Sequence, residues 1–410
     1  MTHAQKTMAI LGGGPSGLMA AELLAAAGHR VTVYDRMPSP GRKLLIAGRG
    51  GLNLTHSEPL DAFIARYGAA AEWLAPSIRA FPPEALRAWC EGLGQETFVG
   101  SSGRVFPKSM KAVQLLRAWL QRLEKLGVTY VPRHRWLGWE GDALRFSDAA
   151  GNEVRVTADA TLLALGGASW PRLGSDGAWT EILAAQGVSV APLRPSNGGF
   201  IVPWSDYFSS RFAGAPLKPV AVTHAGITRQ GEAMVTAQGL EGGVLYALSA
   251  ALREAIDAQG SAAITLDLRP AMTRDALTQK LQAAPRASKS LSTYLQKMGF
   301  APMAIALLRE VTPPEQLATM QAAALAGRLK ALPLILTATT GIARAISSAG
   351  GIACAEVDAQ FQLKAKPGVF VAGEMLDWEA PTGGYLLQAC FSTAVMAAQG
   401  IETRLVPAGR

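Results

Sequence analysis

Apolar residues near the start of the chain follow two periods in turn. Met8–Leu11 is a continuous apolar run, which is typical of a strand buried inside a parallel sheet. Apolar positions at helical spacing follow over residues 18–25, and Gly28 ends that segment. Val31–Tyr34 is a second apolar run, ending at Asp35. The pattern predicts a strand, a helix and a second strand.

The same two periods recur further along the chain and at its end. Residues 112–126 have an amphipathic helical pattern, and 128–131 and 158–165 resemble buried strands. Near the C-terminus, 368–372 predicts another strand and 389–398 a helix of small apolar residues. Alternating strands and helices of this kind indicate an α/β fold.

The middle of the chain has a different pattern. Short alternating runs between residues 199 and 270 predict the strands of a small barrel or sheet, with a helix at 244–256 following a glycine-rich turn. Residues 273–331 have helical spacing, and their leucines and methionines are expected to be core. The predicted domains are listed in chain order: 1–195, first part of a nucleotide-binding domain; 196–270, an inserted barrel-like domain; 271–335, a small helical domain; 336–410, second part of the nucleotide-binding domain.

Composition restricts the protein class. Of 410 residues, 49% are hydrophobic and only 17% are charged, which excludes a disordered chain. The three cysteines, Cys90, Cys354 and Cys390, are far apart and share no ligand spacing with the five histidines, so we expect neither a disulfide framework nor a metal site. No apolar stretch is long enough to cross a membrane, and we expect a cytoplasmic protein.

The formal net charge is +8, and much of it lies in one region. Residues 104–135 contain eight lysines and arginines and a single acid, Glu124. A solvated basic face explains this run, and contact with nucleic acid is the alternative.

The first strand leads into Gly12-x-Gly14-x-x-Gly17, in the strand–turn–helix–strand context of a dinucleotide-binding site. Gly12 permits the tight turn, Gly14 lets the backbone approach a pyrophosphate, and Gly17 lets the helix pack on the strand. Asp35, at the end of the second strand, is placed to accept the ribose hydroxyls, and its charge disfavours a 2′-phosphate. A glycine turn without a ligand is the structural alternative.

Two further segments favour FAD over NAD. The loop from Pro40 to Thr55 is rich in glycine and arginine and has no apolar period, so it resembles an anion-binding nest, with an ordinary surface loop as the alternative. At the other end of the chain, strand 368–372 leads through Gly373-Glu374 to Gly383-Gly384 and a helix. Amides at Gly384 and Tyr385 begin that helix, so both ends of the chain are expected to meet on one long cofactor.

The runs PGRKLLIAGRGGLNLTH, LLALGGASWPRLGSDG, SSAGGIACAEVD and VAGEMLDWEAPTGGYLLQ resemble the BaiN/YhiN-like family of bacterial FAD-dependent oxidoreductases, which includes aminoacetone-oxidase-like flavoproteins. The resemblance covers about half the chain. It implies an α/β, Rossmann-like FAD-binding domain of the two-dinucleotide-binding-domain type, built from both chain ends. One departure is Leu52, where many relatives have a cysteine, so chemistry that needs that thiol is in doubt.

The motifs and the resemblance together give a set of cofactor-binding residues. Trp136 enters it because the family reaches the adenine by backbone contact at the matching place. The set is Gly12, Gly14, Pro15, Ser16, Gly17, Asp35, Arg36, Gly41, Arg42, Lys43, Gly50, Asn53, Trp136, Gly166, Gly167, Gly373, Glu374, Gly384, Tyr385, Leu386 and Gln388.

No second complete glycine motif follows a strand, and no cysteine pair is spaced to relay electrons. We therefore expect the flavin to exchange electrons directly with a substrate between the FAD domain and the inserted domain. Candidate catalytic residues are Asn53, Asp377 and Tyr385; Asp377 and Glu379 are alternatively solvated or capping acids, and His56 has no partner in the sequence.

Two function classes remain open. The first is a small-molecule FAD oxidoreductase, with a small amine as a candidate substrate. The second is an RNA-directed flavoenzyme that reduces uridine in ribosomal RNA with NAD(P)H as a transient electron donor, since some YhiN-like proteins are linked to that modification. The basic region at 104–135 favours the second class, and Leu52 counts against it. A non-catalytic flavin-dependent scaffold is a third reading, and oligomeric state stays open.

Overall fold

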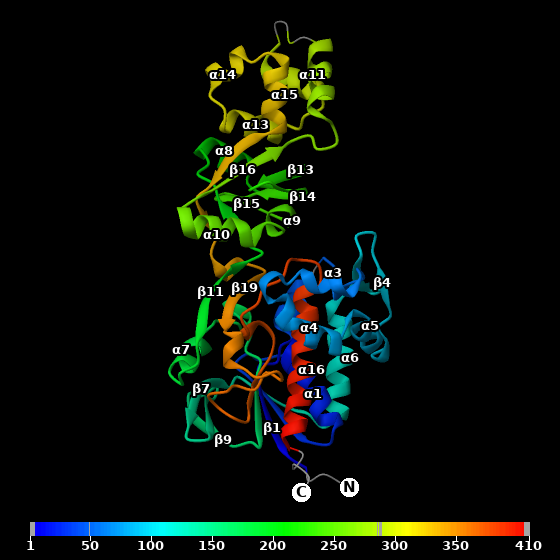
Figure 1. The fold of residues 1–410 in the computed structure, drawn as a ribbon, viewed down its shortest axis with the longest axis vertical. Helices are drawn as coiled ribbons and strands as arrows, with labels where there is room; N and C mark the ends of the chain where they lie inside the picture. The colour runs from blue at the N-terminus through cyan, green and yellow to red at the C-terminus, as the bar shows by residue number, and fades with distance from the viewer. Residues whose placement is uncertain (1–4, 49, 285, 287–288, 406–410) are drawn as a thin grey trace. The chain divides into compact units, whose positions relative to one another are not determined.

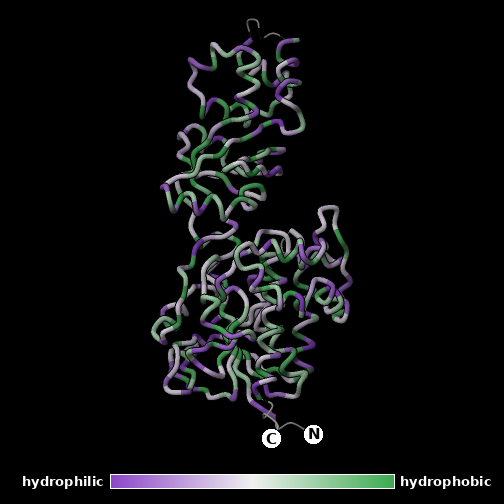
Figure 2. The backbone as a smooth tube through the Cα atoms, in the orientation of Figure 1, coloured by the Kyte–Doolittle hydropathy of each residue, from purple (hydrophilic) through white to green (hydrophobic). Residues whose placement is uncertain are grey.

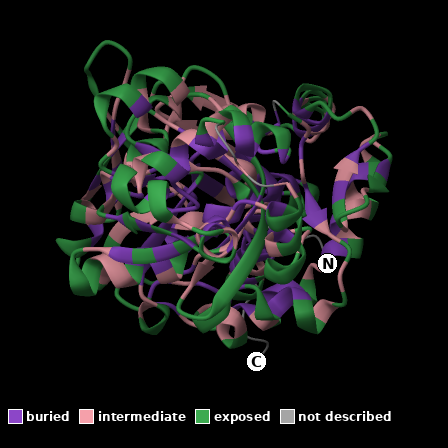
Figure 3. Cartoon of the chain, turned by 90° about the horizontal axis from the view of Figure 1, so that it is seen from above, coloured by how far each residue is buried: buried purple, intermediate pink, exposed green. Residues whose placement is uncertain are grey.

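The structure is a computed structural model that describes residues 5–48, 50–284, 286 and 289–405. Its chain divides into two compact units, one formed by residues 1–195 and 346–410 and the other by 196–345. Each unit has its own hydrophobic core, and Figure 3 colours the chain by how far each residue is buried. The second unit is therefore an insertion in the sequence of the first.

Five described strands form a parallel sheet in the first unit, in the order β20-β10-β1-β2-β6. This is the order of a Rossmann fold, with β1 beside the point where the strand order reverses. The α/β, Rossmann-like class predicted from the sequence is confirmed. The strands are β1 (Thr7–Leu11), β2 (Arg30–Asp35), β6 (Thr129–Pro132), β10 (Ala160–Leu163) and β20 (Val369–Val371).

Helices from both ends of the chain pack together in this unit. The long C-terminal helix α16 lies beside α1 (Figure 1), and α1 also contacts α6. The helices are α1 (Pro15–Ala26), α2 (Arg42–Ala47), α3 (Leu60–Ala65), α4 (Ala71–Ala80), α5 (Pro83–Gly92), α6 (Ala112–Lys125), α7 (Trp179–Ala184) and α16 (Tyr385–Leu405).

Three smaller sheets complete the first unit. They join β3 (Thr55–His56), β5 (Arg104–Pro107) and β4 (Thr97–Val99); β7 (Arg135–Glu140), β8 (Ala143–Ser147) and β9 (Glu153–Val156); and β11 (Val190–Ser196) with β19 (Ser347–Ile352). Short 3₁₀ turns include η2 (Pro171–Leu173) and η5 (Gly373–Met375).

The second unit combines helices with one antiparallel sheet whose strands differ in length. Its described strands run in the order β17-β16-β13-β14-β15-β12-β18 with antiparallel pairing. They are β12 (Phe200–Ile201), β13 (Pro216–His224), β14 (Ile227–Val235), β15 (Gly239–Glu241), β16 (Ala262–Asp267), β17 (Leu332–Leu336) and β18 (Ala338–Thr339). Two of these strands, β17 and β18, come after the helical segment in the sequence.

The helices of the second unit are α8 (Asp206–Phe212), α9 (Gly243–Tyr246), α10 (Ser249–Gln259), α11 (Arg274–Ala283), α12 (Leu291–Lys297), α13 (Pro302–Glu310), α14 (Pro314–Thr319) and α15 (Ala322–Lys330). The predicted helix at 244–256 is two helices, broken after Tyr246, and the glycine-rich turn before it contains strand β15. Leu291, Leu295, Met298 and Met303 are buried in the core, as predicted from their spacing.

Hydrophobic stretches along the backbone are short and interrupted by hydrophilic residues (Figure 2). Among the residues that the structure describes, no helix has the length and apolar character to span a bilayer.

Candidate functional site

The glycine motif forms the turn between β1 and α1. Gly12 has φ +108°, and a Cβ there would clash with the Ala164 carbonyl; a Cβ at Gly17 would clash with the Gly12 carbonyl. Gly14 has open space where its Cβ would lie. Pro15 opens α1, and Gly14 before it supplies no side-chain cap, so the first amides of α1 face an open loop that suits a phosphate.

Asp35 closes the other side of this turn. Its carboxylate accepts the backbone N–H of Gly13 and that of Met37, each at 2.7 Å. Burial raises the pKa of Asp35, although these amides and the nearby Arg36 and Arg42 lower it. An acid placed here by β2 has remaining lone pairs for ribose hydroxyls.

Two further polar groups beside Asp35 suit a bound ligand. The Tyr130 hydroxyl and the Arg42 Nε are buried and have no hydrogen-bond partner among the described residues. Buried polar groups are nearly always paired, so two such groups near one acid point to a missing partner. Tyr130 is not among the residues predicted from the sequence. No local pattern marks Tyr130, because only the parallel pairing of β2 with β6, with Val33 opposite Tyr130, brings its side chain beside Asp35.

Arg36 reaches into a different segment. Its guanidinium donates to the carbonyls of Pro171 (2.5 Å) and Gly174 (2.9 Å) and pairs with Asp176 at 3.0 Å. These contacts hold the segment around η2 against the end of β2. The side chain thus shapes the loop beside the candidate site.

The expected loop after Asp35 contains a helix. Arg42–Ala47 forms α2, and Gly41 before it is left-handed at φ +68°, with its N–H bonded to the Gly13 carbonyl at 2.8 Å. The segment has no apolar period because it is only six residues long. Gly50, the next predicted residue, has open space at its Cβ position.

Lys43, in α2, meets Glu374 from the C-terminal end of the chain. The two side chains pair at 3.0 Å, and Lys43 also donates to the Ser169 hydroxyl at 2.9 Å. The second Glu374 oxygen accepts the Ser348 N–H at 3.3 Å, and a Cβ on Gly167 would clash with the Ser348 hydroxyl. Four segments therefore converge around one partly buried ion pair.

Ser16 and Gly373 make a second link between the two ends. The Ser16 hydroxyl donates to the Cys390 carbonyl at 3.0 Å, and a Cβ on Gly373 would clash with that hydroxyl. Gly373, at φ +76°, also donates its N–H to the Thr393 hydroxyl. Gly166 accepts a hydrogen bond from the Trp179 indole at 2.8 Å.

The start of α16 lies against the loop that follows Gly50. A Cβ on Gly384 would lie 2.5 Å from the Thr55 Cα, so the two backbones are in contact. Three buried oxygens in these segments lack a partner among the described residues: Asn53 Oδ1, Thr55 Oγ1 and Gln388 Oε1. The Gln388 amide donates instead to the Phe81 carbonyl at 2.7 Å. Unpaired acceptors beside helix amides fit a ligand with adjoining N–H and C=O groups, as a flavin has.

Trp136 is buried on β7 and packs edge-on against Trp139 at 4.7 Å, with its indole N–H unpaired among the described residues. Leu386 is half-buried in the first turn of α16 and packs against the core of the first unit.

The three candidate catalytic residues lie in different settings. Asn53 is half-buried, with the unpaired oxygen noted above. Asp377 is exposed, and its N–H donates to the Ile352 carbonyl at 2.9 Å. Tyr385 is buried and its hydroxyl donates to Glu58 at 2.5 Å. His56 has the partner that the sequence did not reveal: its ring stacks on Tyr385 at 5.5 Å.

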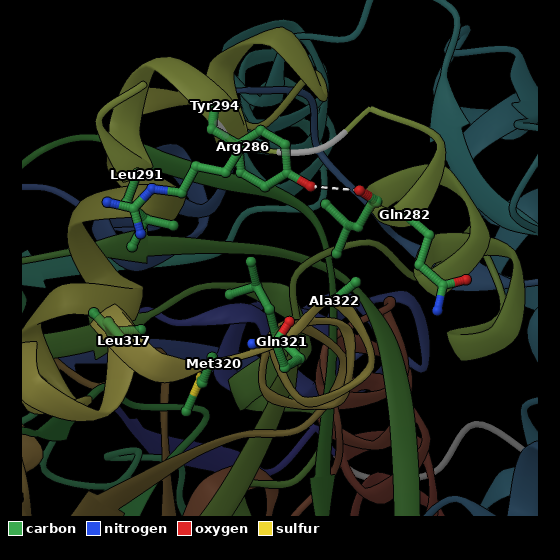
Figure 4. Close-up of a pocket in the computed structure, with 10 residues that line it drawn as sticks. Gln282, Arg286, Leu291, Tyr294, Leu317, Met320, Gln321 and Ala322 are labelled. Atoms are coloured by element: carbon green, nitrogen blue, oxygen red, sulfur yellow. Dashed lines mark hydrogen bonds between the residues drawn. The ribbon is translucent and has the colours of Figure 1, made fainter. Parts of the chain in front are cut away.

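A separate cavity of about 290 Å³ lies in the second unit, lined by residues of α11, α12, α14 and α15 (Figure 4). Its lining is mostly apolar and includes none of the residues predicted to bind the cofactor. The converging groups described above all belong to the first unit.

A protein-family model described as "HI0933-like protein Rossmann domain" matches residues 6–400. This chain belongs to the HI0933-like family. The predicted resemblance to the BaiN/YhiN-like flavoproteins is confirmed, and so is the predicted class: the protein is an FAD-dependent oxidoreductase.

Relatives of this HI0933-like protein match over nearly their whole length. The 3-dehydro-bile acid delta(4,6)-reductase of Clostridium scindens is 26% identical, over 96% of this chain and 98% of the relative. The ribosomal RNA dihydrouridine synthase of Escherichia coli strain K12 is 25% identical, over 96% and 97%.

Solved structures share the fold at low identity. A flavocytochrome c3 fumarate reductase in its open conformation has a TM-score of 0.55 and 11% identity, over 99% of this chain and 79% of that one. The 3-ketosteroid delta1-dehydrogenase of Sterolibacterium denitrificans, in complex with 1,4-androstadiene-3,17-dione, has a TM-score of 0.54 and 12% identity, over 98% and 100%.

Proposed function

We propose that the converging residues of the first unit hold FAD and that the cofactor exchanges electrons directly with an organic substrate. The observation that carries this proposal is the Lys43–Glu374 pair, which joins segments 331 residues apart beside the glycine turn. A long dinucleotide is bound by contacts from separate segments, and a partly buried pair of this kind brings such segments together.

In this proposal, different residues of the first unit bind different parts of FAD. The amides of Gly14 and the first turn of α1 bind the pyrophosphate, and Asp35 binds the ribose. Tyr130 and Arg42 complete the polar surroundings of that ribose. Asn53, Thr55 and the amides that begin α16 hold the isoalloxazine ring. When bound, FAD accepts or donates a hydride and a proton.

Direct exchange is supported by the cysteines. All three are free, and burial raises the pKa of both Cys90 and Cys390 to about 12. Buried thiols with high pKa values remain protonated and react slowly in thiol–disulfide exchange. We infer that no protein dithiol stands between the flavin and the substrate.

For the substrate we propose a small molecule with a carbon–carbon double bond conjugated to a carbonyl. The names of both full-length relatives, a delta(4,6)-reductase and a dihydrouridine synthase, denote addition of hydrogen to such a bond. Leu52 is fully buried and has no ionisable group, so the proton must come from another residue or from water. NADH or NADPH is the proposed electron donor, and a small amine is the competing substrate class.

The test begins with the absorption spectrum of the purified protein, followed by anaerobic titration with NADH and NADPH. The reduced protein is then mixed with a panel of conjugated enones, and the oxidised protein with a panel of small amines. Reoxidation by an enone supports the double-bond proposal. Bleaching by an amine, with peroxide formed in air, would instead identify an amine oxidase, and a colourless protein that binds no added FAD would refute cofactor binding.

The second candidate function is reduction of uridine in RNA, favoured by the basic region. Three of its cations are ion-paired: Lys108 with Glu96, Arg122 with Glu22, and Arg135 with Asp176. The others form no ion pair within the described part of the chain: Arg104, Lys111, Arg117, Lys125 and Arg133. Exposed Phe98 and Val99 lie on β4, which precedes these five residues in the sequence.

Exposed cations that form no ion pair, and an exposed aromatic ring in the neighbouring part of the sequence, are features that suit single-stranded nucleic acid. If RNA is the substrate, log affinity for a ribosomal RNA fragment falls linearly with log salt, and replacing Lys111, Arg117 and Lys125 with glutamine reduces the slope by about 2–3. Binding that is weak and unaffected by these substitutions would exclude RNA.

A further inference from the structure

Tyr385, the first residue of α16, is held on every side. Its side chain is 4% exposed, and its hydroxyl donates to Glu58 Oε1 at 2.5 Å. Its ring stacks on His56 at 5.5 Å and packs against Phe63 at 4.8 Å. Its backbone carbonyl accepts the Tyr67 hydroxyl at 2.8 Å. One residue at a helix start therefore has its ring, hydroxyl and backbone fixed.

The charges around Glu58 determine which partner of the Tyr385–Glu58 hydrogen bond carries the proton. Arg66 donates to both oxygens of Glu58, at 2.7 and 3.0 Å at closest, and this hydrogen bonding lowers the pKa of Glu58. Burial and the Glu58 bond raise the pKa of Tyr385. The proton therefore stays on Tyr385 and the charge on Glu58 near neutral pH. Charge-assisted bonds of this type are among the stronger ones in proteins.

His56 supports the ring without supplying a proton. Its Nδ1 accepts the Glu58 N–H at 3.1 Å, so that nitrogen carries no hydrogen, and its Nε2 lies 2.9 Å from the Ser102 carbonyl, which can only accept. Both ring nitrogens are thus occupied. The imidazole is a packing surface for Tyr385.

The residues that hold Tyr385 all come from one short stretch, residues 56–67. That stretch follows directly after Asn53 and Thr55, whose buried oxygens lack partners among the described residues, and Thr55 contacts Gly384. The polar contacts of Tyr385 therefore join the start of α16 to the stretch that continues from the loop proposed to hold the isoalloxazine ring.

We propose that Tyr385 is a positioning residue whose bond to Glu58 fixes the first amides of α16 against the flavin and thereby sets the flavin's reduction potential. This inference rests on the proposed function. Helix N-terminal amides stabilise negative charge, and reduced FAD carries more negative charge than oxidised FAD on its ring. Fixing those amides favours the reduced form.

The test is the reduction potential of the FAD-loaded protein, measured against a reference dye, together with FAD affinity. In Tyr385→Phe, the ratio of affinities for reduced and oxidised FAD falls about two- to fivefold. That equals a shift of about 10–20 mV to more negative potential for a two-electron couple. Glu58→Ala gives the same shift, and Glu58→Gln gives a smaller one because the amide oxygen still accepts the hydroxyl.

Tyr294→Phe is the matched control. Tyr294 is also buried and donates its hydroxyl to a carbonyl, that of Leu281 at 2.7 Å, but it lies in the second unit, and its replacement leaves the potential unchanged. A wild-type potential in Tyr385→Phe and Glu58→Ala, with FAD still bound, overturns the inference and leaves the proposed function standing. Failure of the wild-type protein to bind FAD overturns the proposed function itself. If Tyr385→Phe does not fold, the Glu58 pair of variants decides.

Discussion

Asp35 shows how a single acid is prepared for a ligand. Two backbone amides donate to its carboxylate, yet burial still raises its pKa. The hydrogen bonds and nearby arginines therefore only partly offset the cost of burying the charged carboxylate. The folded apoprotein holds this proton more tightly than the unfolded chain does. Asp35 therefore contributes stability below its ordinary pKa of 3.8, and that contribution is lost as pH rises through the folded value.

The raised pKa of Asp35 predicts that FAD binds more weakly in acid. Ribose hydroxyls donate to the carboxylate, so affinity falls as pH drops through the raised pKa of Asp35. Asp35→Asn weakens binding about 10- to 100-fold at neutral pH, from a charged hydrogen bond of about 1.5–3 kcal/mol. It also flattens the pH dependence. Fluorescence titration with FAD between pH 4 and 8 measures both effects, and an unchanged pH profile in the variant contradicts the assignment.

A second prediction concerns the backbone contact of Gly384. Gly384 and Gly28 have nearly the same backbone angle, φ +95° and +94°, but only Gly384 has a neighbour, the Thr55 backbone, where a Cβ would lie. Gly28→Ala costs about 1–2 kcal/mol of strain. Gly384→Ala adds about 1–3 kcal/mol of overpacking and lowers FAD affinity as well. Thermal melts and FAD titrations of the two variants check this; equal losses would show that the contact is unimportant.

Elements differ in how far local sequence determines them. The strands of the parallel sheet and helices α1, α6 and α16 follow from apolar runs and helical spacing, because each is long enough to show its period. Helix α2 escaped prediction because six residues between glycines show no period. The break after α9 and the pairing of Lys43 with Glu374 depend on distant contacts, which no local pattern contains. The same holds for Tyr130, which the strand register brings beside Asp35.

The link between α2 and η5 predicts unequal effects of its two partners. Glu374 is more buried than Lys43, with 9% against 22% of the side chain exposed. Lys43→Met leaves that carboxylate without its cation, whereas Glu374→Gln leaves an amide that can still bond. We expect Lys43→Met to lower stability more, with a coupling of about 0.5–3 kcal/mol between the two sites. Melting of the two single variants and the double variant measures it, and additive losses would disprove the coupling.

The whole molecule contains one dinucleotide turn in its described residues, within the first of two units. The second unit enters after Pro195 and ends at Ala345, and its core is separate. The FAD-binding fold, and its construction from both ends of the chain, could be predicted because the motifs that indicate them are local. A ligand for the second unit could not be predicted, since the residues that line its cavity form no recognisable motif.

The free cysteines and the single dinucleotide-binding turn predict how many electrons each chain takes up on full reduction. Anaerobic titration with dithionite should consume two electrons per chain, with one FAD bound, because no described thiol pair can accept more. Cys354→Ser, which removes the exposed thiol, should leave this count unchanged. Four electrons per chain would reveal a second redox group.

The edge position of β20 has a consequence for synthesis on the ribosome. Strand β10 ends at Leu163, but its partner β20 begins at Val369, about 200 residues later. At about 5–20 residues per second, translation leaves the outer edge of β10 uncovered for about 10–40 seconds. Such an apolar edge invites pairing with other nascent chains, so this protein is expected to need chaperone shielding until its last strand emerges.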